Sequence, residues 1–286
     1  MRPVDIFRLI LLGAIWGSSY LFMKIAAPVI GVSFTISARI IIATIILLTA
    51  FSITKRLPNF RQHWKSFFVL GALNMALPMA LITFSVIHLN ASVSATLNAT
   101  TPMFTMLATS IWLKEKLSIK KVAGMVVGIL GVSVLVGWVP LALTKEVYLS
   151  IIMALAGALC YGIAGVYTKV KFSKADPIRT AAGQMVSASI LLLPVLLSSS
   201  SELVFSPKII MAILVLGIVC TAAGYTLFFQ LISSAGSVNT SLVTLIVPVF
   251  SLIWGVLFLG EPINVGLIAG LILIMVSLTL IIRTSR

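Results

Sequence analysis

Long apolar stretches, separated by short polar segments, follow one another along almost the whole sequence. Charged residues, prolines and clusters of Ser or Asn bound these stretches, and each one is long enough for a helix across a bilayer, which needs roughly 20 apolar residues. None shows the two-residue alternation of a membrane β-strand. The sequence therefore predicts an all-α membrane protein with ten transmembrane helices, at residues 7–27, 33–51, 67–87, 91–112, 120–138, 148–168, 178–197, 209–231, 238–259 and 264–282.

The composition agrees with this prediction, because 60% of the 286 residues are hydrophobic and only 9% are charged. Soluble domains have about 45–50% apolar and about 25% charged residues, so this chain lacks the polar side chains to cover a surface in water. The longest stretch outside the predicted helices, residues 52–66, has about fifteen residues. The sequence therefore leaves no room for a soluble catalytic or nucleotide-binding domain.

The net charge of +14 would suggest nucleic acid as a partner of a soluble protein. Here the cations lie at the ends of the predicted helices, where anionic headgroups attract them, so we expect the lipid bilayer and no nucleic acid as a partner. Sixteen Lys and Arg residues fall on the side of the N-terminus, and only Lys24, Lys145 and Lys208 fall on the other. By the positive-inside rule, both termini should face the cytoplasm of a multi-pass protein, which we expect in a bacterial plasma (inner) membrane.

The two halves of the sequence align when one is shifted by 145 or 146 positions. The shift places Gly17 on Gly162, Lys24 on Lys169, Arg39 on Gln184, Pro102 on Pro248 and Glu115 on Glu261. Residues 1–142 and 143–286 are therefore predicted to form two repeats of five helices each. Because five is an odd number, the second repeat enters the membrane upside down, and inverted repeats of this kind enclose a binding site near the bilayer midplane in many transporters.

Several of these residues belong to patterns that the chain shares with a known family. In the first half they are Trp16-Gly17-Ser18-Ser19 with Lys24, the stretch from Pro102 to Glu115, and Gly124, Gly128 and Gly131. In the second half they are Tyr161-Gly162 with Lys169, the stretch from Pro248 to Gly260-Glu261-Pro262, and Gly266 with Gly270. In the order and spacing of these residues, the chain resembles the drug/metabolite transporter superfamily, EamA type.

The resemblance implies a secondary transporter, built from two five-helix repeats, that exports or exchanges small polar metabolites, often amino acids. It also implies a cavity lined by the first, third, fourth, sixth, eighth and ninth predicted helices, with the fifth and tenth outside. We accordingly expect alternating access, amino acids or related compounds as substrates, no cofactor and no enzymatic reaction. The second half has Tyr161 where the first half has Trp16, which leaves open whether an aromatic pair acts in the cavity.

Prolines inside the predicted helices mark candidate binding positions. Pro102 and Pro248 fall in the middle of the fourth and ninth predicted helices, and Pro78 falls in the third. A proline kinks a helix and frees the carbonyl four residues earlier, here those of Asn98 and Thr244. The polar side chains near these kinks that we expect to bind substrate are Asn74, Asn98, Thr100, Thr101 and Thr244. Their alternative role is to join helices through hydrogen bonds within the membrane.

Four aromatic residues lie on helices predicted to line the cavity: Trp16, Tyr20, Tyr161 and Tyr225. Membrane aromatics usually sit at the interface with water, but Trp16 follows Phe7 by nine residues and is therefore near mid-depth. An aromatic wall there could stack on a substrate or hold its ammonium group through cation–π contact.

Four charged residues are candidates for gating or charge recognition. Arg39 is the only charge well inside a predicted helix. Its side chain either faces the protein interior and binds a substrate carboxylate, or it has a structural role only and extends its guanidinium to the membrane interface. The same two roles are open for Lys24. Glu115 and Glu261 each end a predicted helix, where they could pair with Lys or with helix ends, or act in gating or proton linkage.

All six acidic residues lie at helix ends or in loops, so no carboxylate is predicted at the membrane centre, where proton- and sodium-coupled carriers often keep one. This favours a facilitator or exchanger. The alternative substrates are a nucleoside-like cofactor or a sugar derivative, and the alternative classes are a channel or a membrane-embedded enzyme, although neither a selectivity-filter repeat nor a catalytic motif is found.

Other features of the sequence predict no chemistry. His63 and His88 have no partner at the spacing of metal ligands, and Cys160 and Cys220 both fall in apolar stretches, so no metal site is expected. The glycines of the fifth and tenth predicted helices suit close helix packing. They either join the two halves or form a homodimer interface.

Overall fold

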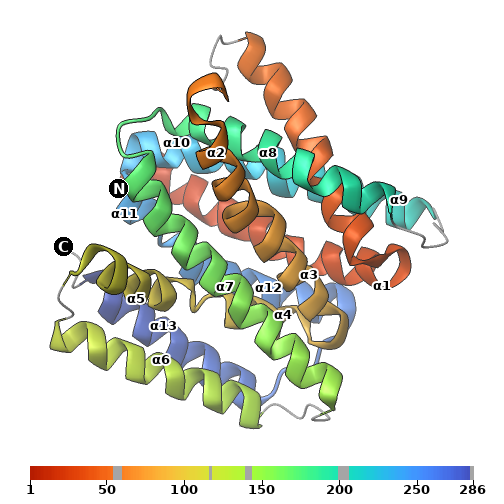
Figure 1. The fold of residues 1–286 in the computed structure, drawn as a ribbon. Coiled ribbons are helices and arrows are strands. Elements are labelled where there is room, and N and C mark those ends of the chain that lie inside the picture. Colours follow the sequence, from red (N-terminus) through yellow and green to blue (C-terminus); the bar gives the residue numbers. More distant parts are fainter. Residues whose placement is uncertain (54–59, 116–117, 139–143, 199–205, 284–286) are drawn as a thin grey trace.

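The computed structural model describes residues 1–53, 60–115, 118–138, 144–198 and 206–283, which form helices and no strands (Figure 1). The helices are α1 (Pro3–Ile53), α2 (Phe60–Gly71), the π-helix η1 (Ala72–Ala76), α3 (Leu77–His88), α4 (Ala91–Asn98), α5 (Thr101–Leu113), α6 (Ile119–Trp138), α7 (Lys145–Lys171), α8 (Pro177–Leu197), α9 (Pro207–Leu214), the π-helix η2 (Val215–Ala223), α10 (Gly224–Ala235), α11 (Ser237–Thr240), α12 (Val243–Leu259) and α13 (Val265–Arg283). The predicted all-helical class is therefore confirmed.

Six helical stretches in the described ranges are long and apolar enough to cross a membrane. They are Pro3–Ile53, His63–His88, Ile119–Trp138, Lys145–Lys171, Pro177–Leu197 and Pro207–Ala235, and two shorter apolar helices are Val243–Leu259 and Val265–Leu280. The first stretch contains two of the predicted helices, because α1 turns sharply at Gly31, whose φ of 77° lies in a region that glycine adopts without strain.

The proline positions differ in part from the prediction. The predicted helix 91–112 is interrupted by a turn after α4, and Pro102 lies in the first turn of the separate helix α5. The carbonyl of Asn98, predicted to be free for a substrate, instead accepts a hydrogen bond from Thr101 Oγ1 at 2.7 Å. Pro248 does lie inside a helix, α12, whereas Pro78 follows η1 at the start of α3.

The glycines of α6 and α13 face one another. A Cβ added to Gly131 would lie 2.9 Å from Ile274, and one added to Gly270 would lie 2.7 Å from Leu135. Residue numbers rise along one helix as they fall along the other, so the two helices run antiparallel, side by side at the lower edge of Figure 1. The glycine rows therefore join the two helices within one chain, which leaves only the opposite faces of α6 and α13 for the predicted homodimer.

Two more close contacts cross between the halves of the chain. A Cβ on Gly17 of α1 would lie 2.7 Å from Phe250 Cβ, and one on Gly162 of α7 would lie 2.7 Å from the amide nitrogen of Thr105. The backbone of α1 thus touches α12, and that of α7 touches α5. The two contacts involve residues that the 145–146 shift places on each other.

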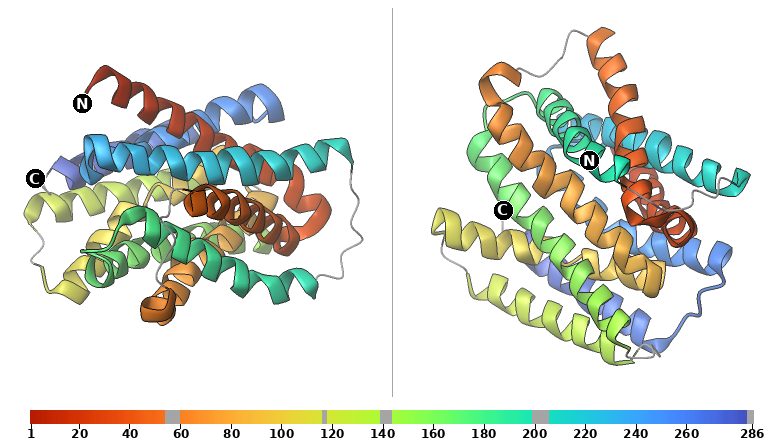
Figure 2. Two further views of the ribbon diagram at one scale, coloured as in Figure 1. Left: turned by 90° about the horizontal axis from the view of Figure 1, so that it is seen from above. Right: turned by 45° about the vertical axis from the view of Figure 1, so that its right-hand side comes forward.

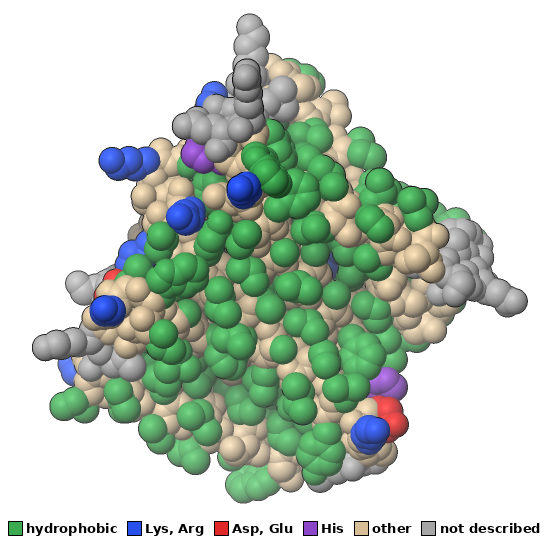
Figure 3. All heavy atoms as spheres, viewed as in Figure 1, with side chains coloured by type: hydrophobic (Ala, Val, Ile, Leu, Met, Phe, Trp, Pro, Cys, Tyr) green, Lys and Arg blue, Asp and Glu red, His purple; other side chains and the backbone are tan. Residues whose placement is uncertain are grey.

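Both ends of the described chain lie at the same end of the helix bundle (Figure 2). Hydrophobic side chains cover the middle of the face seen in Figure 3, and Lys and Arg side chains gather mainly along its left and upper-left edge, on the side of the termini. An apolar band with a cationic edge is the surface expected of a protein that spans a bilayer.

Candidate functional site

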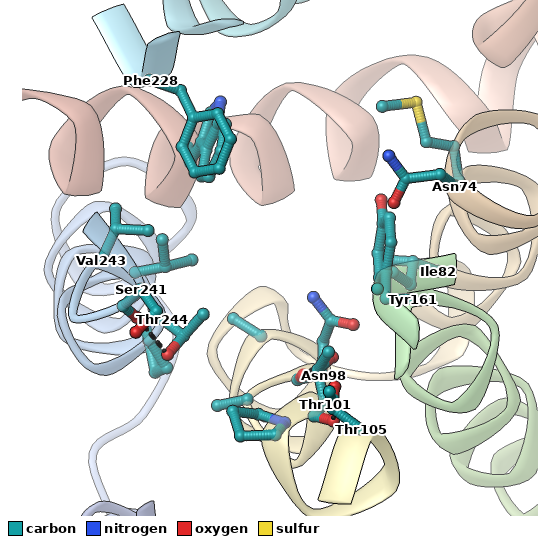
Figure 4. A pocket seen from close by; sticks show the side chains of 18 of the residues that line it. Asn74, Ile82, Asn98, Thr101, Thr105, Tyr161, Phe228, Ser241, Val243 and Thr244 are labelled. Atoms are coloured by element: carbon teal, nitrogen blue, oxygen red, sulfur yellow. Dashed lines mark hydrogen bonds between the residues drawn. The ribbon is translucent and has the colours of Figure 1, made fainter. Parts of the chain in front are cut away.

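A cavity of about 830 Å³ lies between α1, η1, α3, α4, α5, α7, α10 and α12 (Figure 4). Of the residues that the sequence singled out, the cavity brings together Trp16, Tyr20, Arg39, Asn74, Asn98, Thr101, Pro102, Glu115, Tyr161, Tyr225, Thr244 and Pro248. Pro78, Lys24 and Glu261 do not line it. Eight of the nine side chains predicted to bind substrate thus line one space, and the labelled ones enter it from several sides in Figure 4. The ninth, Thr100, does not line it, because its side chain is buried and its hydroxyl donates to the carbonyl of Leu97 at 2.7 Å.

One wall of the cavity is aromatic. The ring centroid of Trp16 lies 5.7 Å from that of Tyr225 and 5.3 Å from that of Phe228, so side chains of α1 and α10 form one cluster. Such distances are typical of favourable aromatic pairs. Tyr161, from α7, stands at another side of the same space. The cavity can therefore hold an apolar or cationic part of a substrate against rings.

Polar groups line other parts of the cavity. Asn98 Nδ2 donates to the hydroxyl of Tyr20 at 2.9 Å, whereas Asn98 Oδ1 is buried and has no hydrogen-bond partner within the described ranges. Asn74 Nδ2 donates to Gln184 Oε1 at 2.9 Å. A buried amide oxygen without a hydrogen-bond partner is costly in a protein interior, so Asn98 Oδ1 is suited to accept a hydrogen bond from a ligand.

Several lining residues were not predicted to bind substrate, among them Ser19, Thr105, Thr109, Lys121, Phe228 and Ser241. Thr101, Thr105 and Thr109 are spaced four residues apart on α5, which places them on one helix face. Each of these hydroxyls donates to a carbonyl of its own chain segment, at 2.7 to 3.0 Å. Their spacing is the signal that could have extended the candidate site from Thr101 toward the cavity mouth.

The cavity reaches the surface at the end where Glu115, Lys121 and Lys169 line it. Glu115 Oε1 and Lys169 Nζ form an ion pair of 2.9 Å, and their side chains are 46% and 61% exposed. Lining residues farther in are buried, including Met23 and Ile82. Water and solutes can therefore enter at this end.

Replacing Glu115 by Gln is expected to leave the midpoint of thermal unfolding nearly unchanged. Exposed ion pairs contribute only about 0–1 kcal/mol, because water already solvates both groups. Unfolding of the purified protein in detergent, followed by intrinsic fluorescence, measures this. A drop of many degrees would mean that the pair holds the bundle together.

The opposite end is closed by the turn between α3 and α4, where Lys24 and Glu261 meet backbone groups. Lys24 Nζ donates to the carbonyls of Ile87 and Leu89, at 3.0 and 2.8 Å. Glu261 is 8% exposed, and its carboxylate accepts from the amides of residues 91 and 92 and, at 2.7 Å, from Ser92 Oγ. The ammonium lies at the C-terminus of α3 and the carboxylate at the N-terminus of α4, so each charge matches the helix dipole that it faces.

Arg39 also lines the cavity, although its helix was not among those expected to do so. The side chain is 6% exposed, and Nε donates to Thr221 Oγ1 at 2.7 Å. Nη1 approaches Met23 Sδ at 3.5 Å. The only deeply placed cation predicted from the sequence thus faces the interior.

Each half of the chain matches the same known protein family. The EamA-like transporter family matches residues 5–137 and, a second time, residues 148–283. The chain belongs to this family. Family membership and the apolar helices make it an integral membrane protein, and they point to a transporter rather than an enzyme.

Curated relatives carry transporter names. An uncharacterized transporter of Bacillus subtilis, YoaV, is 24% identical over 91% of this chain and 90% of its own. A probable terminal-alkyne amino-acid exporter of Streptantibioticus cattleyicolor is 23% identical over 93% and 89% of the two chains. A protein crystal structure of 16% identity superposes over the whole of both chains with a TM-score of 0.69, which shows the fold alone.

Proposed function

We propose that this protein is a secondary transporter that carries small polar metabolites, with amino acids and related compounds as the leading class, by alternating access. The observation that carries the proposal is the central cavity, which is open beside Glu115 and Lys169 and closed beside Lys24 and Glu261. A carrier needs this arrangement, because its site must open to one side at a time.

Inverted repeats over residues 1–142 and 143–286 are part of the proposal. The antiparallel packing of α6 on α13 supports them, because the two helices hold equivalent places in the two halves. The contacts of Gly17 and Gly162 support them as well, and so does the double match to the family. An alternating carrier follows when two such halves exchange conformations around one site.

The two ends of the cavity carry residues that the repeat relates. Lys24 and Glu261 hold the closed end, whereas their counterparts Lys169 and Glu115 pair with each other at the open end. The open end lies on the side with sixteen Lys and Arg residues, which the positive-inside rule assigns to the cytoplasm. The structure then corresponds to a state that faces inward, with both termini in the cytoplasm.

The cavity chemistry favours amino acids over the alternatives. It offers an aromatic wall, uncharged amides and one buried cation, and Glu115 at the mouth is its only carboxylate among the described lining residues. The name of the amino-acid exporter of Streptantibioticus cattleyicolor adds support. A nucleoside-like cofactor or a sugar derivative would use the rings and amides but not the cation.

Counterflow in proteoliposomes tests the proposal. Vesicles loaded with one unlabelled solute are given the same solute in labelled form outside, for a panel of amino acids, nucleosides and sugars. A carrier accumulates label transiently, and the rate saturates with concentration. Non-saturable flux would indicate a channel, chemical change of the solute would indicate an enzyme, and saturable flux of sugars or nucleosides alone would reject amino acids.

Collapsing the pH gradient across the vesicles is expected to leave the initial rate unchanged. None of the described acidic residues lies deep in the cavity, where carriers coupled to protons often keep a titrating carboxylate. The rate is measured with and without a protonophore, at constant membrane potential. Strict dependence on the gradient would contradict a facilitator or exchanger.

A further inference from the structure

The guanidinium of Arg39 is a buried charge that faces an open cavity. The side chain is 6% exposed, and the hydrogen bonds that it donates among the described residues reach only the neutral groups Thr221 Oγ1 and Met23 Sδ. Thioether sulfur is a weak acceptor. Moving an arginine from water to such a place is unfavourable unless an anion or several strong acceptors compensate.

No acidic side chain in the described part of the chain compensates Arg39. Glu202 lies outside the described residues. The others have different contacts: Asp5 with Arg2, Glu115 with Lys169, Glu146 with Thr144, Asp176 with the amide of Ile178, and Glu261 with the amides of residues 91 and 92. An anion that enters the cavity would therefore meet an uncompensated cation.

The other half of the chain shows that the packing at this position does not need a charge. Gln184, which the 145-residue shift places on Arg39, bonds to Asn74 in the π-helix η1. Arg39 bonds to Thr221 in the π-helix η2. Both side chains thus link a helix to the π segment that packs against it, and a neutral amide suffices in one half. The charge of Arg39 must serve something else.

We propose that Arg39 binds the carboxylate of the transported substrate, which makes the substrate class organic monoanions and zwitterions with a carboxylate. Asn98 Oδ1, buried and without a partner among the described residues, accepts a hydrogen bond from a donor on the same substrate. An amino acid supplies both groups. This inference rests on the proposed transport function, and a planar guanidinium fits a planar carboxylate through two parallel hydrogen bonds.

Thermal-shift titrations of the purified protein test the site without transport. The probes are pairs that differ at one group: L-leucine with L-leucinol, L-methionine with L-methioninol, and L-phenylalanine with L-phenylalaninol. Inorganic phosphate is added as a second kind of anion. The acids are expected to raise the unfolding temperature and the alcohols are not. Equal shifts within each pair, no shift with any acid, or a shift with phosphate alone would overturn the proposal.

Three variants assign the effect to Arg39. Arg39→Gln, which copies the residue of the other half, is expected to weaken carboxylate binding about 10- to 100-fold, since hydrogen bonds between charged groups are lost. Arg39→Lys keeps the charge without the planar fork, and an intermediate affinity is expected. Gln184→Met is the matched control, because it breaks the equivalent bond to Asn74 and leaves the preference for acids intact.

The stability of the empty protein separates binding from a structural role. Removing an uncompensated buried charge is expected to leave the unfolding temperature of Arg39→Gln unchanged or higher. A fall of several degrees with an unaltered ligand preference would show that Arg39 is structural. Saturable counterflow of neutral solutes at equal rates in the parent protein and in Arg39→Gln would reject the carboxylate site but not the proposed transport function. Absence of saturable flux for every solute would reject the transport function itself.

Discussion

Glu261→Ala is expected to destabilise the protein strongly and to open the closed end of the cavity. The substitution leaves the amides of Ala91 and Ser92 and the hydroxyl of Ser92 without their acceptor in a buried place. Hydrogen bonds to charged groups contribute about 1.5–3 kcal/mol each, so the loss should be about 3 kcal/mol or more. Thermal unfolding in detergent measures it.

Opening of the closed end of the cavity is measured with a cysteine that replaces Ile82, a buried lining residue near that end. In a chain with Ile82→Cys and both native cysteines replaced by Ser, a membrane-impermeant maleimide applied from the side of Lys24 should react slowly. Adding Glu261→Ala should speed the reaction several-fold. Glu115→Ala, at the open end, is the control and should change neither stability nor this rate; equal effects of both substitutions would contradict a specific closure by Glu261.

Gly162→Ala is expected to cost about 1–3 kcal/mol of stability and most of the transport rate. The new methyl group would lie 2.7 Å from the amide nitrogen of Thr105 and 2.8 Å from the carbonyl carbon of Phe104. Backbone atoms cannot turn aside as a side chain can, so α7 and α5 must separate. Thermal unfolding and counterflow measure the two effects.

Gly137→Ala is the matched control, because nothing lies within 4 Å of the Cβ that it adds to α6. Alanine favours a helix over glycine by up to about 1 kcal/mol, so this variant should be as stable as the parent or more stable. If Gly162→Ala behaved like Gly137→Ala, the close approach of α7 to α5 would not hold the two halves together.

The sequence predicted the helical class and much of the cavity lining because both follow from local patterns. Apolar length indicates a span, and polar or aromatic side chains in the middle of a span have little reason to face lipid. Asn74, Asn98 and Thr244 were predicted to face the cavity for this reason, and they line it in the structure. The glycine rows of α6 and α13 were predicted to pack closely, and only their partner was left open.

Other features depend on contacts between distant parts of the chain, which local patterns do not encode. Glu261 reaches Ser92, 169 residues earlier, and Arg39 reaches Thr221, 182 residues later. The sequence predicted a break between residues 27 and 33, and α1 turns within it at Gly31. The sequence did not show that this break is a turn at one residue, because a glycine between two apolar stretches is also compatible with an ordinary loop. The carbonyl of Asn98 is occupied because Thr101 lies within reach on the next turn.

The π segment η1 contributes Asn74 to the cavity wall, and the π segment η2 contains Thr221, the partner of the lining residue Arg39. A π turn holds about one residue more than an α turn, so its conversion to α shifts the hydrogen-bond register by one. The half-helix beyond it then rotates by about 100° without unfolding. Asn74 and Thr221, the partners of Gln184 and Arg39, therefore lie in helical segments that can rotate. A rotation of either segment would change the polar groups that a substrate contacts in the cavity.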